Sequence, residues 1–183
     1  MEVHLRTSHR FAFALAALLG CSSALAVEQN PPTETQTYGD WTVRCFPVQS
    51  DGPCDLAQES TNQQTKQRLV VISIAYAPRN DRYAVTIVVP LGVQLPSGLV
   101  IAHGDYRSKP FPFRRCEDDG CYVEAALDPA VIEVLSKGAD KSSLNITAFA
   151  GGAISLPLSL KGFPQAMVAM KRLAQEKTAI ASK

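Results

Sequence analysis

Two neighbouring runs of β-branched and apolar residues constrain the fold of this chain more than any other feature. They are Leu69–Tyr76 and Tyr83–Val89, and a polar turn cluster at 78–81 separates them. β-branched residues favour extended backbone, and a short polar turn between two such runs predicts an antiparallel pair of strands. Both runs are apolar enough to predict central strands that are covered on both faces, or nearly so.

Shorter extended segments surround this pair. The pattern predicts strands at Trp41–Phe46, Asp55–Glu59, Leu99–Ala102 and Tyr122–Leu127, and a hairpin formed by 144–150 and 153–160. Many short strands with turn signals between them are typical of a sandwich. The sequence therefore predicts a mainly β fold, with β-sandwich-like antiparallel sheets and two short helices.

The two helices have different signals. Asp128 precedes Pro129, which predicts a helix that begins there and ends at Gly138. Ala130, Val131, Val134 and Leu135 are expected to share its apolar face. The last helix is expected to begin near Pro164, and its apolar stripe is expected to pack on the core. That stripe comprises Phe163, Met167, Met170 and Ala174.

The first 26 residues have the order of segments found in a secretory signal peptide. Arg6 and Arg10 lie in a basic start, Phe11–Leu19 is apolar, and Ala24–Ala26 ends in small residues. The apolar run is well below the roughly 20 residues that span a bilayer. We expect cleavage after Ala26 and export to the periplasm or outer envelope. In one alternative, Cys21 of a lipoprotein signal becomes a lipid anchor. A buried N-terminal helix is a less favoured alternative.

The remaining cysteines fall into two close pairs, namely Cys45 with Cys54 and Cys116 with Cys121. An exported protein meets an oxidising compartment, so an even set of cysteines predicts disulfides. Asp-Gly turns lie between the members of each pair, and local pairing is therefore favoured. A four-cysteine zinc site is disfavoured, because eight residues separate the first pair. Thiol exchange is also disfavoured, because no C-x-x-C occurs.

Charge excludes a strongly basic nucleic-acid-binding protein. The chain has 18 Lys plus Arg and 17 Asp plus Glu, a formal net charge of +1. Cleavage after Ala26 removes two basic residues and one acidic residue, which leaves a mature chain with no net charge. Nucleic-acid-binding domains carry a pronounced basic patch or stripe. We therefore expect no nucleic-acid partner.

The sequence contains none of the common catalytic motifs in complete form. His103 is the single histidine of the mature chain, with Asp105 two residues later, and we expect it on the surface at a strand end. No P-loop, H-E-x-x-H, G-x-G-x-x-G or G-x-S-x-G pattern occurs. Glu117–Asp119 is expected to be a solvated turn rather than a calcium loop. We expect no catalytic residue, metal or cofactor.

A group of basic and aromatic residues around the second cysteine pair forms a candidate interaction patch. Positive charge here would suit an anionic lipid headgroup, lipopolysaccharide or a protein, although ordinary solvated charge is the simpler interpretation. The patch comprises Tyr106, Arg107, Lys109, Arg114 and Arg115.

The chain resembles the bacterial invasion-associated locus B family. The resemblance is carried by Tyr38–Cys45, Cys54, Leu91–Leu99, Pro112–Cys116, Gly120-Cys121 and Leu156–Ala166, and covers about residues 36–175. It implies an exported α-proteobacterial protein with a β-sandwich-like fold, from a family named for host-cell invasion. It carries no catalytic residue over to this chain.

Together these observations predict a domain organisation and a function. We expect a signal peptide at 1–26, a flexible lead-in at 27–37, a β domain at 38–176 and a C-terminal tail at 177–183. We expect a non-enzymatic binding, host-interaction or envelope-associated protein, whose partner is an envelope component or protein, with peripheral or outer-membrane association. The alternatives are an envelope hydrolase that uses His103 or a carboxylate pair, and a structural, stress-protective envelope protein.

Overall fold

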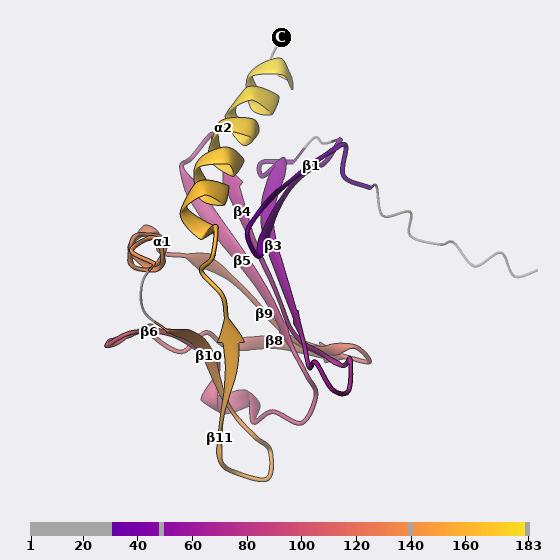
Figure 1. Ribbon diagram of the computed structural model, residues 1–183, viewed down its shortest axis with the longest axis vertical. Coiled ribbons are helices and arrows are strands. Elements are labelled where there is room, and N and C mark those ends of the chain that lie inside the picture. The colour runs from indigo at the N-terminus through magenta and orange to yellow at the C-terminus, as the bar shows by residue number, and fades with distance from the viewer. Residues whose placement is uncertain (1–30, 48–49, 139–140, 182–183) are drawn as a thin grey trace, which may run out of the picture.

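The computed structural model of the protein describes residues 31–47, 50–138 and 141–181, and folds them into two antiparallel sheets with two α-helices (Figure 1). The expected signal peptide and Cys21 lie outside the described residues. The larger sheet has the order β1 (Glu34–Tyr38), β2 (Trp41–Cys45), β3 (Cys54–Thr61), β4 (Arg68–Ala77), β5 (Arg82–Val89), β9 (Gly120–Leu127) and β8 (Phe113–Glu117). The smaller sheet has the order β11 (Ala153–Leu158), β10 (Ser142–Thr147), β6 (Val100–His103) and β7 (Tyr106–Arg107). The helices are α1 (Pro129–Ser136) and α2 (Phe163–Ala181), with a short 3₁₀ turn, η1 (Leu95–Ser97). The mainly β, sandwich-like prediction is confirmed.

The predicted central pair lies where the sequence places it. β4 is the middle strand of the larger sheet and pairs with β5 through a register that includes Tyr76 and Tyr83. The prediction that both faces are covered, or nearly so, holds at the end of β5, where Ile87, Val88 and Val89 are all buried. In β4 the second face is only partly covered, because successive residues alternate between buried and partly exposed. One face of the strand packs into the core, and the other is half solvated, as is common for antiparallel sheets.

A single hydrophobic core joins both sheets and α2. Buried residues of the larger sheet, such as Leu56 and Ile87, belong to the same cluster as Leu144 of the smaller sheet. The predicted stripe of α2 faces this core, since Phe163, Met167, Met170 and Ala174 are each at most 5% exposed. In Figure 1, α2 lies along the end of the larger sheet that is remote from the β10–β11 hairpin. The four buried positions confirm the predicted core-facing stripe.

The turn between β1 and β2 docks against the junction between β11 and α2, and we call this contact the clasp. The indole Nε1 of Trp41 donates a hydrogen bond to the carbonyl oxygen of Ser159 at 2.8 Å. The Trp41 ring also meets the Phe163 ring edge to face, with centroids 5.1 Å apart. The Gln58 side chain donates to the Ser159 carbonyl at 2.9 Å and accepts from its amide at 3.0 Å. The clasp therefore connects segments more than 100 residues apart in sequence.

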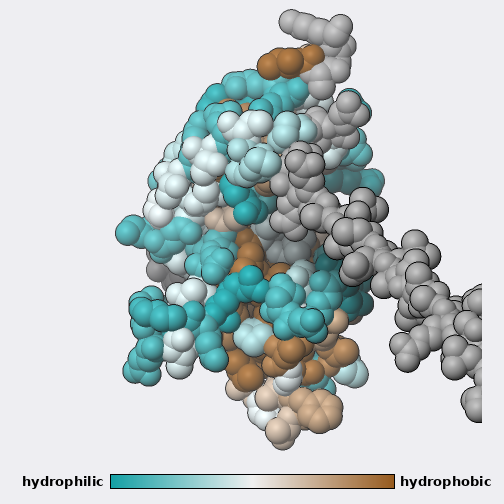
Figure 2. All heavy atoms as spheres, turned by 90° about the vertical axis from the view of Figure 1, so that its right-hand side faces the viewer, coloured by the Kyte–Doolittle hydropathy of each residue, from teal (hydrophilic) through white to brown (hydrophobic). Residues whose placement is uncertain are grey.

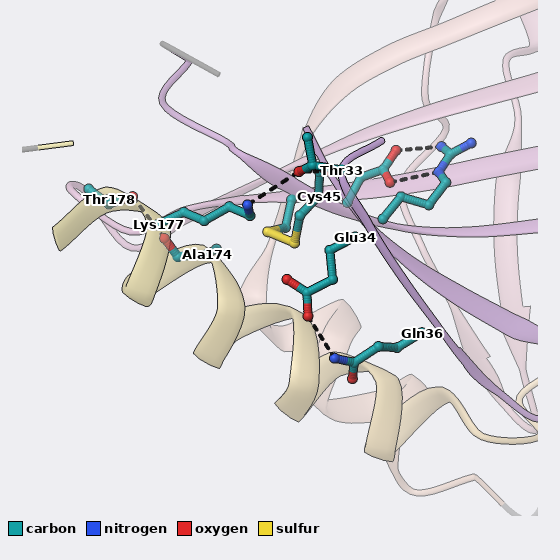
Figure 3. Close-up of a disulfide and its surroundings, with 10 residues drawn as sticks. Thr33, Glu34, Gln36, Cys45, Ala174, Lys177 and Thr178 are labelled. Carbon is teal, nitrogen blue, oxygen red and sulfur yellow. Dashed lines mark hydrogen bonds and ion pairs between the residues drawn. A yellow bond between two sulfur atoms is a disulfide. The ribbon is translucent and has the colours of Figure 1, made fainter. Parts of the chain in front are cut away.

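Both ends of the expected domain differ from the prediction. Residues 34–37 of the expected flexible lead-in belong to β1, which pairs with β2 along its whole length. The expected tail from residue 177 is helical as far as Ala181. Figure 3 shows the two ends together: Lys177 of α2 reaches Thr33, and Thr33 binds the carbonyl oxygen of Cys45. Pairing with β2 extends the larger sheet into the expected lead-in, and α2 continues into the expected tail.

Several local features also differ from expectation. α1 buries Val131, Ile132 and Leu135, whereas Ala130 is exposed. α2 has 19 residues and is not a short helix. The sequence prediction did not include β7 or β8, which are paired with their neighbours through only a few residues.

Candidate functional site

The two disulfides join the cysteines that lie close in sequence, as their spacing predicts. Cys45 is bonded to Cys54 across β2 and β3, and Cys116 to Cys121 across β8 and β9. Each pair occupies directly opposite positions of its ladder. The first disulfide is fully buried, while Cys116 of the second is exposed. The disulfides fasten two hairpins of the larger sheet, and neither joins the two sheets.

His103 lies at the end of β6, but the expected surface position is wrong. Its side chain is only 6% exposed. The imidazole Nδ1 lies 2.7 Å from the hydroxyl oxygen of Ser142, the opposite residue on β10. No described carboxylate hydrogen-bonds the imidazole, so the pair does not form a Ser-His-Asp arrangement among the described residues.

A shallow concavity of about 560 Å³ lies beside this pair on the smaller sheet. We call it the cationic concavity, because its charged lining residues are Arg107 and Lys141. The remaining lining residues are small, hydroxyl-bearing or apolar: Ala102, Gly104, Ser142, Ser143, Ser155, Leu156 and Pro157. No described carboxylate lines it. The lining thus combines two cationic residues, Arg107 of β7 and Lys141 directly before β10, with three serines of β10 and β11.

The two charged groups of the concavity are held differently. The Arg107 guanidinium donates to the carbonyl oxygens of Gly104 and Tyr106, at 2.6 and 2.7 Å. These bonds fix the side chain without neutralising it, since no described carboxylate lies within ion-pair distance. Lys141 is exposed, and its backbone carbonyl accepts from the Gly104 amide at 3.3 Å. Such groups are suited to an anionic ligand.

The interaction patch expected from the sequence is divided between the two sheets. Tyr106 and Arg107 lie on β7 of the smaller sheet, whereas Arg114 and Arg115 lie on β8 of the larger sheet. Lys109 lies in the connection after β7. Of the five residues, only Arg107 lines the cationic concavity.

Arg115 is neutralised by its own hairpin. It bonds to Glu117 at 2.5 Å and to Glu124 at 2.6 Å, and it stacks over the Tyr122 ring. The hydrogen bonds to these carboxylates, Glu124 first, raise the pKa of Arg115. The carboxylates of Glu117 and Glu124 are held in these ion pairs. Arg115 is therefore compensated and a poor candidate for an anion site, whereas Arg114 donates to the backbone carbonyl of Glu124 and has no ion pair with a described carboxylate.

Two more concavities, of about 500 and 440 Å³, share Arg82, Tyr83 and Ala126 near the β4–β5 turn. Lys171 of α2 lies over the rings of Tyr76 and Tyr83, and its ammonium is 3.6 Å from Asp81. A hydrogen bond with Tyr83 is the main cause of the raised pKa of Lys171. Lys171, Asp81 and the two tyrosines thus satisfy one another, whereas Arg82 has no ion pair with a described carboxylate.

Neither a metal-binding cluster nor a membrane-spanning helix occurs among the described residues. No cluster of three or more His, Cys, Asp or Glu side chains within them could hold a metal ion. No helix among them combines the length and apolarity that crossing a membrane requires.

The comparisons with known proteins agree with this architecture. Residues 41–171 match the sequence profile described as Invasion associated locus B (IalB) protein. The chain belongs to the invasion associated locus B family. It is 26% identical over 168 residues to invasion protein B homologs of Brucella abortus strain 2308 and of biovar 1 strain 9-941, covering 90% of this chain and 95% of each relative. The crystal structure of invasion associated protein B from Bartonella henselae has the same fold, with a TM-score of 0.69, 20% identity, and coverage of 78% of this chain and 99% of that chain.

The sequence motifs that this chain shares with the invasion associated locus B family can now be placed in the structure. The motifs around Trp41 and Phe163 that carry the resemblance meet in the clasp, so they are structural. The polar side chains of the cationic concavity were missed apart from Arg107. The run Lys141-Ser142-Ser143 at the beginning of an apolar strand was the available signal, since it marks where polar groups reach the end of a sheet.

Proposed function

We propose that this member of the invasion associated locus B family is an exported, non-enzymatic binding protein of the periplasm or outer envelope. It binds an anionic envelope component in the cationic concavity. The observation that carries this proposal is the pairing of Arg107 and Lys141 around a hollow with no described carboxylate. The relatives are named for invasion, which is consistent with a binding protein, and a host-cell surface is a second place where such binding would occur.

The proposed location has a test of its own. The two disulfides fit an oxidising compartment, and the first 26 residues have the order of a signal peptide. Intact mass of the protein recovered from its native bacterium should correspond to a chain that begins at Val27. A diacylglyceryl adduct on Cys21 would instead show a lipid anchor and contradict cleavage after Ala26.

The binding proposal is tested with the immobilised mature protein and a native envelope extract. Retained lipids, saccharides and proteins are identified by mass spectrometry for the wild type and for the double variant Arg107→Gln/Lys141→Gln. The variant should lose an anionic component that the wild type retains. The control variant Arg79→Gln removes an exposed cation that pairs with Asp51 away from the concavity, and it should retain that component. Equal retention by all three proteins would refute the proposed site.

A hydrolase is the second candidate, because the imidazole of His103 lies 2.7 Å from the Ser142 hydroxyl and Ser142 lines the concavity. A positioned imidazole can act as general base for a hydroxyl nucleophile. Ester and amide substrates should therefore be screened with the wild type, Ser142→Ala and His103→Ala. Turnover that both substitutions abolish, in variants that remain folded, would favour this candidate over the binding protein.

A further inference from the structure

Four exposed apolar side chains gather at the end of the molecule that carries the β10–β11 hairpin. We call them the apolar tip: Leu91, Leu95, Phe149 and Ile154, which are 55%, 46%, 81% and 38% exposed. Backbone bonds hold the segments together, since the Phe149 amide donates to the Gly92 carbonyl at 2.7 Å and the Gln94 amide to the Thr147 carbonyl at 2.8 Å. Ile154 pairs with Ile146 across the hairpin. The apolar tip is therefore one surface built from two distant parts of the chain.

The segments that form the apolar tip contain no formal charge. Neither 90–104 nor 142–160 includes Asp, Glu, Lys or Arg, although charged residues make up 19% of the whole chain. Figure 2 shows hydrophobic residues gathered toward this end, with hydrophilic residues above them. Uncharged segments that expose aromatic and aliphatic side chains are suited to leaving water for an apolar phase.

The cationic concavity and the apolar tip both include residues of the smaller sheet. Ser155 of β11 lines the concavity, and the preceding residue, Ile154, belongs to the tip, although successive side chains of a strand leave opposite faces of the sheet. Arg107 of β7 and Lys141, directly before β10, lie toward one end of the small sheet, whereas Phe149, in the turn after β10, and Ile154 of β11 lie toward the other. Within residues 100–107 and 141–158, which contain these side chains, the acidic residue is Asp105, in the turn between β6 and β7.

From this juxtaposition we infer that the smaller sheet docks on an anionic lipid bilayer. The apolar tip enters the interfacial region, and the cationic concavity takes the phosphate of a lipid headgroup. The inference rests on the proposed function, because it uses the same concavity and names a lipid bilayer as its anionic partner. Apolar burial and attraction to anionic headgroups together are what a peripheral protein needs to bind a membrane surface.

The size of the apolar tip argues against a second copy of the chain as its occupant. A fully exposed aromatic side chain offers only about 150–250 Å². Four partly exposed side chains therefore supply less than the roughly 800 Å² that each partner of a standard protein interface buries. A bilayer requires no such minimum area, since each inserted side chain contributes separately to binding.

The test measures binding to vesicles and the depth of the tip. The mature protein is mixed with vesicles of equal parts phosphatidylglycerol and phosphatidylcholine, or of phosphatidylcholine alone, and separated by flotation. The wild type should float with the anionic vesicles and be released by salt at about 0.5 M, where charges are screened within a few ångströms. Phe149→Gln and Arg107→Gln/Lys141→Gln should each weaken binding roughly five- to tenfold.

A matched control comes from the other end of the molecule. Val168 of α2 is 71% exposed, so Val168→Gln removes a comparable exposed apolar side chain and should leave binding unchanged. In Phe149→Trp, the new indole should be quenched by brominated lipid. Trp41 is fully buried and should not be quenched, which makes the wild type the reference for that measurement.

Each remaining outcome overturns the inference. A wild type that does not float, or a Phe149→Gln or Arg107→Gln/Lys141→Gln variant that floats as well as the wild type, excludes bilayer docking by this face. A dimer in light scattering that Phe149→Gln dissociates would assign the tip to a second copy. If flotation fails while the envelope extract still yields an anionic component that needs Arg107 and Lys141, the inference fails and the proposed function stands.

Discussion

At the scale of single residues, the clasp shows why the motifs that carry the family resemblance lie where they do. Gly162 has a φ of +84°, and a β-carbon added there would overlap the carbonyl oxygen of Tyr38. Only glycine permits both this φ and this approach of two backbones. The approach brings Trp41 against Phe163 and the Ser159 carbonyl. These residues therefore have structural roles, and their presence does not indicate a binding site.

Substitution of Gly162 should destabilise the fold more than substitution of a glycine with a similar φ in open space. We expect Gly162→Ala to lower the free energy of unfolding by roughly 3 kcal/mol, because φ strain and a backbone clash add. Gly151 has a φ of +90° and no heavy atom within 4 Å of the added β-carbon, so Gly151→Ala should cost only about 1 kcal/mol. Urea unfolding of the oxidised proteins measures both. Equal losses would show that the close approach to Tyr38 has no energetic weight.

Asp119 should titrate below the usual carboxyl range. The Tyr122 hydroxyl lies 2.8 Å from both of its oxygens, and this hydrogen bond is the main reason that the pKa of Asp119 is lowered, with Arg68 at 3.0 Å adding to it. We expect Tyr122→Phe to raise the pKa of Asp119 in a carboxyl NMR titration, and Arg68→Gln to raise it less.

The sign of the linked stability follows from this lowered pKa. A carboxyl with a folded pKa below its unfolded value, which is about 3.9, stabilises the fold fully above that pH. The contribution is lost as pH falls through the folded value, because protonation ends the ion pair and weakens the hydrogen bond. Tyr122→Phe should therefore flatten the decline of stability below about pH 4. An unchanged Asp119 titration in Tyr122→Phe would contradict the assigned cause.

At the scale of elements, the sequence predicts those strands that are rich in apolar and β-branched residues or are flanked by a clear turn signal. β4 and β5 are rich in β-branched residues, and the hairpin of β10 and β11 is marked by Gly151-Gly152, so all four were predicted close to their observed bounds. β1 is an edge strand of polar residues and was missed, because its order comes from pairing with β2. The same limit applies to the cationic concavity, whose side chains converge only through the register of three strands.

The two hairpin disulfides should differ in how readily they are reduced. Cys45 and Cys54 are fully buried, whereas Cys116 is exposed, and thiol–disulfide exchange needs direct access of a thiolate to sulfur. Mild reduction of the folded protein, followed by alkylation and peptide mapping, should label Cys116 and Cys121 before Cys45 and Cys54. Replacing both cysteines of either pair with alanine should cost about 2–3 kcal/mol. Earlier labelling of the buried pair would show that the β2–β3 hairpin opens more easily than its burial implies.

At the scale of the whole molecule, two sheets of unequal size share one core and are joined without any disulfide between them. Figure 1 shows α2 along one end of the larger sheet and the β10–β11 hairpin of the smaller sheet at the other end of the molecule. The smaller sheet bears the cationic concavity, and the apolar tip lies at its β10–β11 turn. Local sequence patterns predict neither the division into sheets nor this placement. Both depend on contacts such as the clasp, between residues more than 100 positions apart.

Because the core and the clasp connect the sheets, the molecule should unfold as one cooperative unit. Leu144 and Ile101 of the smaller sheet are fully buried beside residues of the larger sheet, so their amides should be protected as strongly as those of Ile72 and Ile87. Hydrogen exchange in low concentrations of denaturant should give the four amides one common opening free energy. Gly162→Ala should lower all four opening free energies by the same amount, since the clasp connects both sheets. A lower value confined to Leu144 and Ile101 would show that the smaller sheet opens on its own, and would make it a separate, more easily opened part of the molecule.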